Sequence, residues 1–315
     1  MGGRGDIAIE RVTTNVGAVI NGIDLRQPQG PGAVATVRQA LIDHGVIFFR
    51  GQDISLEQFW AFLENFGHPQ KEEIKGTDHD SPADVHTADM SPSRYSTATW
   101  HADTTSLPRP PMATALRAAA PPEFGGDTLW SSMQAAWDAL SPPMQQMLDG
   151  MTAVHSIKPT AETMQEYGQI FLADYESRHG GDSIHPVVLT HPESGRKTLY
   201  VSECFTTRII ELAPAESAAV LAMLLRHMQR PEFIMRWKWQ SGDIAFWDNR
   251  SVQHYAVPDY TEARVMQRIV LAGVKPGEPS ALVGAGELAS ESPTTCAASA
   301  PPAAGRAIAG RAPRR

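Results

Sequence analysis

The sequence predicts a mostly β protein with helices, of the α+β class, built on a β-sandwich or barrel core. Short segments rich in β-branched and aromatic residues recur along the chain, from residues 46–49 to residues 265–272. The helical patterns fall mostly in blocks of their own, whereas a doubly wound sheet would alternate helices with strands. No internal repeat, glycine-rich phosphate loop or G-x-S-x-G motif occurs in the sequence.

The N-terminal part predicts two short strands, a helix, a buried strand and a second helix. Residues 7–25 are expected to form the strands and their turn, and residues 33–44 the first helix, which ends at Gly45. Residues 46–49 are all apolar, which is typical of a strand buried on both faces. The second helix begins with a capping box and carries an apolar stripe, formed by Ser55 and Gln58 and by Leu56, Phe59, Trp60 and Leu63.

The middle of the chain predicts a lid, one strand and three helices. Residues 69–99 are polar and contain Pro82 and Pro92, so we expect a mobile lid there. A strand at 127–130 leads into two helices separated by Ser141, a natural N-cap residue that precedes Pro142. A third helix is expected at about 161–178.

The last part predicts strands around one more helix. Strands at 187–190 and 198–201 are joined by a turn, and a helix follows at 214–229. Aromatic and apolar residues then alternate with polar ones up to Trp239, and strands follow at 244–247 and 265–272. We expect a single domain at residues 1–275. Residues 276–315 are rich in Ala, Gly, Pro and Ser, which predicts a disordered tail.

Composition excludes several classes of protein. The formal net charge of the 315 residues is -8, and no basic stripe suggests nucleic-acid binding. No apolar run approaches the roughly 18 to 20 residues that cross a bilayer, and no signal peptide is indicated, so we expect a cytoplasmic protein without membrane contact. The two cysteines support neither a disulfide framework nor a zinc–cysteine cluster. Small anionic substrates remain compatible with this charge, because a pocket can be locally basic.

The strongest functional pattern is His101-Ala102-Asp103. If this segment is a strand, His101 and Asp103 point to the same face and can bind one metal ion. His254 is the best candidate for a third ligand, and the set would match the two-His, one-carboxylate triad of non-haem Fe(II) oxygenases. The pair could instead be exposed, and His254 could be a structural histidine. With eleven histidines in the chain, His191-Pro192-Glu193 is a competing pattern, disfavoured by its proline and its predicted turn.

A second pattern places Arg264, Met266 and Arg268 at even offsets. On a strand the two guanidiniums would share one face, which is costly unless anions meet them. Arginine is well shaped to hold a carboxylate, and the hydroxyl of Thr128 can add a hydrogen bond. The alternative is two arginines on a solvated edge.

Six ordered blocks together resemble a known family, the Fe(II)- and 2-oxoglutarate-dependent dioxygenases related to taurine dioxygenase and 2,4-dichlorophenoxyacetate dioxygenase. The blocks are residues 17–25, 46–52, 100–103, 125–130, 185–188 and 247–260, followed by the two arginines.

This resemblance implies a double-stranded β-helix (jelly roll) fold with iron bound by His101, Asp103 and His254. It also implies that Thr128 and Arg264 hold the distal carboxylate of 2-oxoglutarate, while Arg268 faces the carboxylate region of the substrate or cosubstrate. The loop from His254 to Arg264 is one residue shorter than is usual in the family, so the division of roles between the arginines stays open.

The resemblance further implies the reaction. Fe(II), 2-oxoglutarate and O2 would hydroxylate a small anionic substrate, an alkylsulfonate, a sulfate ester or an aryloxyalkanoate, whose product often collapses and releases its leaving group. Arg268, Phe205, Lys71 and His68 are candidate substrate residues, although Lys71 could be a solvated surface residue and Phe205 a core aromatic. The alternatives are a metal-dependent hydrolase or isomerase on a jelly roll, which would need no O2, and a jelly-roll binding module. Homo-oligomer formation is left open.

Overall fold

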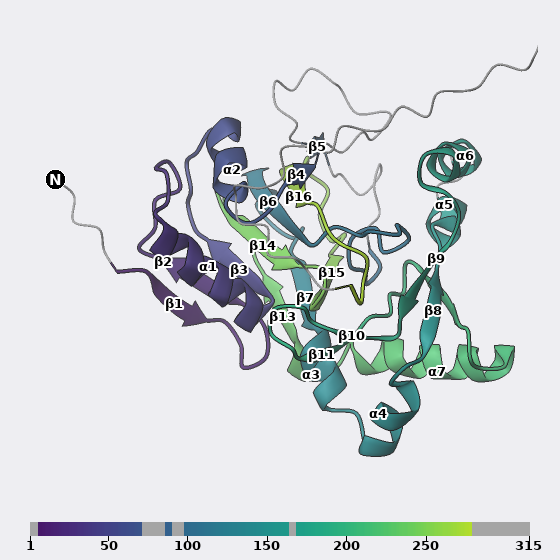
Figure 1. Ribbon diagram of the computed structural model, residues 1–315. Coiled ribbons are helices and arrows are strands. Elements are labelled where there is room, and N and C mark those ends of the chain that lie inside the picture. The colour runs from purple at the N-terminus through teal and green to yellow at the C-terminus, as the bar shows by residue number, and fades with distance from the viewer. Residues whose placement is uncertain (1–5, 71–85, 90–97, 164–167, 279–315) are drawn as a thin grey trace, which may run out of the picture. The chain divides into compact units, whose positions relative to one another are not determined.

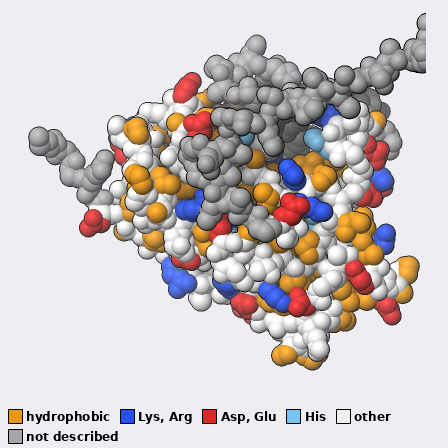
Figure 2. Space-filling view, in the orientation of Figure 1, with side chains coloured by type: hydrophobic (Ala, Val, Ile, Leu, Met, Phe, Trp, Pro, Cys, Tyr) orange, Lys and Arg blue, Asp and Glu red, His pale blue; other side chains and the backbone are white. Residues whose placement is uncertain are grey.

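The computed structural model describes residues 6–70, 86–89, 98–163 and 168–278, all within one unit, Met1–Leu282. The tail expected at 276–315 lies outside these ranges except for residues 276–278. Of the lid expected at 69–99, only 69–70, 86–89 and 98–99 are described. The single-domain boundary at residue 275 therefore stays a prediction. No helix in the described ranges is long and apolar enough to cross a membrane. On the face shown in Figure 2, basic and acidic side chains lie interspersed among hydrophobic ones.

A large mixed sheet, of eight strands in the described residues, is the main sheet of this unit (Figure 1). Its strands pair antiparallel except for the parallel pair β2 and β3. An additional strand, β5 (His86–Asp89), also pairs with β16. In spatial order the other strands are β1 (Ala8–Arg11), β2 (Ala18–Asn21), β3 (Val46–Phe49), β14 (Ile244–Asp248), β6 (Ala113–Ala120), β16 (Val265–Leu271) and β4 (Pro69–Gln70).

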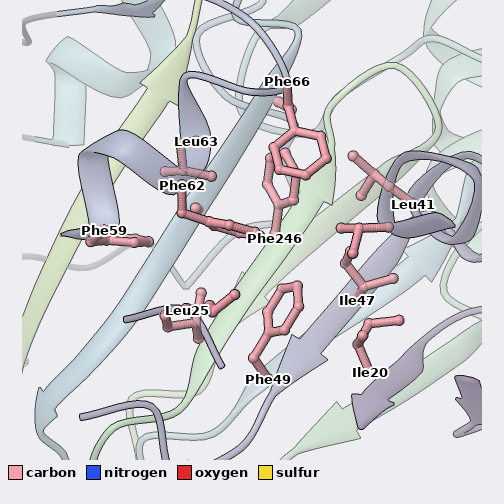
Figure 3. Close-up of a cluster of buried hydrophobic side chains, with 14 of the residues drawn as sticks. Ile20, Leu25, Leu41, Ile47, Phe49, Phe59, Phe62, Leu63, Phe66 and Phe246 are labelled. Carbon is pink, nitrogen blue, oxygen red and sulfur yellow. The ribbon is translucent and has the colours of Figure 1, made fainter. Parts of the chain in front are cut away.

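Two helices, α1 (Pro31–His44) and α2 (Leu56–Leu63), cover one face of the large sheet. Both end signals expected from the sequence are present. Gly45 has a φ of 71° and donates its N–H to the carbonyl of Leu41, and Ser55 and Gln58 form the reciprocal capping box of α2. Figure 3 shows the apolar cluster between these helices and the sheet, where Phe62 meets Phe49 with ring centroids 5.4 Å apart. Burial of these apolar side chains stabilises the layer.

The opposite face of the large sheet packs against a smaller sheet. This sheet has the order β13 (Ile234–Trp237), β7 (Thr128–Ser132) and β15 (Val252–Ala256). Phe48 of the large sheet stacks on Trp237 of the small one, with ring centroids 3.8 Å apart, and meets Trp130 edge-on. The predicted β-rich core with helices is confirmed at this level, as a mixed α/β protein with a sheet-rich core.

A third group of elements packs beyond the small sheet. A three-stranded sheet has the order β12 (Thr206–Ile209), β8 (Thr152–His155), β9 (Ser183–Pro186), and β10 (Val188–Thr190) pairs with β11 (Lys197–Leu199) as the predicted hairpin. The helices are α3 (Met133–Asp138), α4 (Pro142–Leu148), α5 (Lys158–Thr163), α6 (Gly168–His179), α7 (Pro214–His227) and the 3-10 helix η2 (Pro231–Phe233).

Several expectations require correction. The sequence did not indicate strands β6, β8, β9, β12 and β15, nor β4 and β5 in the segment expected to be a lid. The helix expected at 161–178 overlaps α5 and α6, and residues 164–167 between them lie outside the described ranges. Ser141 occupies the N-cap position of α4, as expected, but its side chain makes no capping hydrogen bond. Of the two signals for the start of α4, only the proline in its first turn acts as expected.

Candidate active site

The backbone brings His101 and His254 side by side. The N–H of His101 donates to the carbonyl of His254 at 3.0 Å, and the reverse bond measures 2.8 Å. His254 lies in β15, but His101 belongs to an isolated bridge, and the chain turns at Asp103 and Thr104. The strand geometry on which the same-face argument depended is therefore absent at 101–103, because the pairing ends after one residue. One ligand atom from each of His101, Asp103 and His254 nevertheless lies within 4.8 Å of the other two.

Hydrogen bonds and packing orient the two imidazoles. Nδ1 of His101 lies 2.8 Å from the carbonyl of Thr99, which can only accept, so this nitrogen carries the proton and Nε2 keeps its lone pair. Nε2 of His254 lies 3.7 Å from Oδ1 of Asp103, and the indole of Trp247 packs on the same ring at a centroid distance of 4.8 Å. A metal ion needs such lone pairs to converge.

Burial and mutual charge set the protonation of the three groups. Burial lowers the pKa of His101, and burial and then the charge of His101 lower the pKa of His254 to about 3. Burial alone would raise the pKa of Asp103, but Arg268, His254 and His101 outweigh it and hold that pKa well below its usual range. Near neutral pH the donor set is two neutral imidazoles and one carboxylate, which fits a divalent transition metal.

Asp103 is held by residues from the large sheet. Thr114 of β6 donates to Oδ2 at 2.6 Å, and Arg268 of β16 donates to Oδ1 at 2.8 Å. The side-chain oxygen of Asn249, directly after β14, accepts the N–H of Asp103 at 3.1 Å. We did not predict Thr114 or Asn249 as site residues. Asn249 lies in a block that resembles the family, but nothing in the alanine-rich segment around Thr114 singles it out.

The turn after Asp103 is anchored by the sheet of β8 and β9. Thr104 has a φ of 40°, a left-handed conformation that is strained for a β-branched residue. Nε2 of His185 donates to the carbonyls of Thr105 and Leu107 at 2.9 and 3.0 Å. His155 is hydrogen-bonded to the Thr105 hydroxyl at 2.9 Å. These buried polar contacts hold the turn in place.

Thr128 and Arg264 meet at the start of β7. Nη2 of Arg264 lies 3.4 Å from Oγ1 of Thr128, and the indole N–H of Trp239 donates to the same oxygen at 3.0 Å. Arg264 is 2% exposed, and burial lowers its pKa. Gly126 has a φ of +65°, and a Cβ there would lie 3.3 Å from Cδ of Arg264. The glycine therefore permits the close approach of the arginine.

The two arginines occupy different places, because Arg264 precedes β16, whose register shifts between Val265 and Met266, whereas Arg268 lies within the strand. Met266 between them packs in the core between the sheets, together with Trp239 and Trp247. Arg264 reaches toward Thr128 and Trp239, whereas Arg268 reaches Asp103. Thr128 is thus brought together with Arg264 and not with Arg268.

The remaining candidates lie as follows. The side chain of His68 is exposed, and its carbonyl accepts the N–H of Ala272 at 2.9 Å. Phe205 is buried in a small cluster with Ile157 and Tyr175. Lys71 lies outside the described residues. The contacts of His68 and Phe205 do not place either of them at the triad.

The competing pattern at His191 has a structural role. Nδ1 of His191 accepts the N–H groups of Glu193 and Ser194, so Nε2 carries the proton and donates to Asp248 at 3.0 Å. Glu193 forms ion pairs with Arg38 and Arg250, at 2.8 Å each. Both ring nitrogens of His191 and both carboxylate oxygens of Glu193 therefore already have partners. The only cluster of metal-ligand type in the described ranges is His101, Asp103 and His254.

A match to a family model shows which protein family the chain belongs to. The model described as "Taurine catabolism dioxygenase TauD, TfdA family" matches residues 8–270. The chain belongs to this family. It is 35% identical over 287 residues to an α-ketoglutarate-dependent sulfate ester dioxygenase of Pseudomonas putida, covering 86% of this chain and 91% of the relative. It is 34% identical to an alkylsulfatase of Acinetobacter baylyi, with 85% of each chain covered.

Solved structures agree with this membership. A taurine dioxygenase from Burkholderia xenovorans has 34% identity and a TM-score of 0.75, with 87% of this chain and 92% of the other covered. The protein AAD-2, in complex with Mn(II) and N-oxalylglycine, has 28% identity and a TM-score of 0.74, with 86% and 99% covered. The predicted family and the predicted class of enzyme, a dioxygenase dependent on 2-oxoglutarate (α-ketoglutarate), are confirmed.

Proposed function

We propose that His101, Asp103 and His254 bind Fe(II) in this dioxygenase. The observation that carries the proposal is the convergence of two imidazoles and one carboxylate within 4.8 Å in a buried site. Such a set leaves three coordination positions for cosubstrate and O2. When bound, Fe(II) and 2-oxoglutarate supply the oxidising chemistry, in which 2-oxoglutarate becomes succinate and CO2 while a substrate C–H bond is hydroxylated. The chain's own residues bind, orient and shield the reacting groups.

The two facing sheets support a jelly-roll description of the core. We propose that they are the halves of a double-stranded β-helix, with β14, β6 and β16 in one half and β13, β7 and β15 in the other. The candidate ligands draw on both halves, since His254 lies on β15 and Asp103 is held by Thr114 of β6. A ligand set that bridges two packed sheets is held with little freedom, which favours a defined metal geometry.

Thr128 and Arg264 are proposed to bind the distal carboxylate of 2-oxoglutarate. Because the Thr128 oxygen already accepts from Trp239, its hydroxyl hydrogen can donate to a carboxylate. Arg264 can offer two parallel N–H groups to the same carboxylate. The burial that lowers the pKa of Arg264 is offset when an anion binds, so the pair suits a carboxylate that enters from solvent.

Arg268 is proposed to hold the anionic group of the substrate. Its guanidinium lies 2.8 Å from a carboxylate oxygen of Asp103, so an anion that binds this arginine is held beside the metal ligands. The side chain of Arg268 is 18% exposed and therefore remains within reach of a ligand. The different surroundings of the two arginines support this division of roles, with Arg264 beside Thr128 and Arg268 beside Asp103.

A sulfate ester is the substrate class that we favour. Two relatives with 35% and 34% identity are named for sulfate ester chemistry, a sulfate ester dioxygenase and an alkylsulfatase. Relatives named for sulfonates and phenoxypropionate have 33% and 29% identity. Hydroxylation of the carbon that bears the ester oxygen would give a product that collapses to an aldehyde and releases sulfate.

A matched substrate panel tests the proposal. An alkyl sulfate and an alkylsulfonate of equal chain length differ only in the ester oxygen, and an aryloxyalkanoate replaces the sulfur-containing group by a carboxylate. Succinate formation with Fe(II), O2 and 2-oxoglutarate is measured for each substrate, together with sulfate release. We expect the alkyl sulfate to give the fastest succinate formation, with sulfate released in equal amount. Faster turnover of the sulfonate or the aryloxyalkanoate would contradict the sulfate ester assignment.

Oxygen dependence separates this function from a metal-dependent hydrolase or isomerase. A hydrolase would release sulfate from the same ester without O2 or 2-oxoglutarate. Such an enzyme would also have no use for the Thr128–Arg264 pair. We expect sulfate release to stop when O2 or 2-oxoglutarate is omitted, and continued release would favour the hydrolase.

A further inference from the structure

We propose that Thr114 and Asn249 form a hydrogen-bonded support that fixes Asp103 and directs its Oδ1 toward the metal. Trp247 donates to Asn249, and these three residues together form the Asp103 support. This inference rests on the proposed metal site and assigns positioning residues to it. Neither Thr114 nor Asn249 is itself one of the three candidate ligands.

The support is needed because side-chain contacts, and not a strand ladder, hold the backbone around Asp103. His101 has only an isolated bridge, Asp103 lies in a turn, and Thr104 has a φ of 40°. A ligand in such a turn lacks the ladder of hydrogen bonds that a strand would supply on both sides. The orientation of its side chain must then come from other contacts.

The hydrogen bonds of the support form a closed chain with defined direction. The side-chain oxygen of Asn249 accepts the N–H of Asp103 at 3.1 Å and the indole N–H of Trp247 at 3.0 Å. The amide nitrogen of Asn249 donates to Oγ1 of Thr114 at 3.0 Å. Since that oxygen accepts from Asn249, the single hydroxyl hydrogen of Thr114 is available for Asp103, and it meets Oδ2 at 2.6 Å.

The direction of these hydrogen bonds selects one oxygen of Asp103 as the ligand. Oδ2 is engaged by Thr114, whereas Oδ1 accepts from Arg268 at 2.8 Å and faces Nε2 of His254 at 3.7 Å, on the side of the two imidazoles. A carboxylate held in this way offers a single oxygen to the metal. The amide orientation of Asn249 follows from the same network, because the opposite orientation would set its NH2 group against two N–H donors.

The large sheet makes the support rigid. Thr114 and Trp247 are register partners on the adjacent strands β6 and β14, and the N–H of Asn249 donates to the carbonyl of Met112 at 3.0 Å. Thr114, Asn249 and Trp247 are all buried. Water therefore cannot replace a lost hydrogen bond without entering the core. The position of Asp103 is thus set from the centre of the sheet.

Metal affinity tests the support without relying on turnover. Fe(II) binding to the full chain is measured anaerobically by calorimetry, with Co(II) as an oxidation-stable probe whose visible spectrum reports its coordination. Thr114→Val keeps the shape of the side chain and removes the hydroxyl, and we expect about 10- to 100-fold weaker binding of both ions. The Co(II) spectrum should also change, because Oδ2 becomes free to approach the ion. Thr114→Ser restores the hydroxyl and should recover most of the affinity.

Matched controls separate the possible outcomes. Thr198→Val removes another buried hydroxyl, in β11, and should leave the affinity and the Co(II) spectrum unchanged. His101→Ala should abolish tight binding. If the His101→Ala variant binds the metal ion as tightly as the wild type, the metal site itself is contradicted. Wild-type binding that is lost with His101→Ala but unchanged in Thr114→Val would overturn the support alone, and Thr114→Ala provides the same comparison if the valine variant does not fold.

Discussion

Replacement of Arg264 by methionine is expected to separate cosubstrate binding from stability. Methionine keeps an unbranched apolar stem and removes the guanidinium. Two charge-assisted hydrogen bonds to the distal carboxylate would be lost, each worth roughly 1.5 kcal/mol at the low end of the usual range. The sum of about 3 kcal/mol corresponds to about 100-fold weaker 2-oxoglutarate binding. Arg264 is 2% exposed, so water is poorly placed to compensate.

Stability should not fall in the same variant. Burial disfavours the charged form of Arg264, as the direction of its pKa shift shows. Removal of the charge relieves that penalty, which offsets the loss of the Arg264 contacts with Thr128 and Tyr260, and Asp127 nearby keeps its ion pair with Arg236 at 2.6 Å. We therefore expect Arg264→Met to unfold, without 2-oxoglutarate, at a temperature no lower than the wild type. The stabilisation that 2-oxoglutarate gives the wild type should be largely lost.

Calorimetric titration of 2-oxoglutarate under anaerobic conditions and thermal unfolding with and without it provide the two measurements. Arg264→Lys keeps the charge without the two-pronged geometry and should show an intermediate affinity. Unchanged 2-oxoglutarate affinity in Arg264→Met would refute the assignment of this arginine. A large loss of stability without ligand would show that the guanidinium serves the fold.

Three further substitutions have defined expected outcomes. Trp239→Phe removes the donor that orients Thr128 and should weaken 2-oxoglutarate binding by about tenfold, measured by the same titration. Gly126→Ala places a Cβ at positive φ, 2.9 Å from Pro122 and 3.3 Å from Arg264, so we expect both lower stability and weaker 2-oxoglutarate binding. Burial lowers the pKa of His155 from 6.5 to about 3, so its contribution to stability is present above pH 6.5 and is lost as the pH falls toward 3. Urea unfolding at pH 7 and pH 5.5 should show a loss of up to about 1.4 kcal/mol from this residue, which His155→Gln removes.

The sequence predicted the helix ends and the buried strand whose signals lie within a few consecutive residues. The capping box at Ser55 and the glycine at position 45 define helix ends, and the apolar run at 46–49 defines a buried strand. Strand β6 was missed because Ala113–Ala120 is rich in alanine, which favours a helix. Its strand conformation comes from pairing with β14 and β16 on either side, a tertiary effect that overrides local propensity.

The candidate site could be predicted as a set of residue types but not as a geometry. The His-x-Asp spacing suggested a strand, whereas the structure places the pair on a bridge and a turn that β8 and β9 anchor. The contacts that hold Asp103 come from Thr114 and Asn249, 11 and 146 residues away along the chain. No spacing rule links such positions, because only the fold brings them together.

The most direct test of the central claim is the absorption of the protein after anaerobic addition of Fe(II) and 2-oxoglutarate. Chelation of iron by 2-oxoglutarate in the proposed site should produce a metal-to-ligand charge-transfer band in the wild type. We expect His101→Ala and His254→Ala to lack the band, and Arg264→Met to require about 100-fold more 2-oxoglutarate to reach half of its intensity. A wild-type spectrum that does not change, or a band that survives in both histidine variants, would contradict the proposed site.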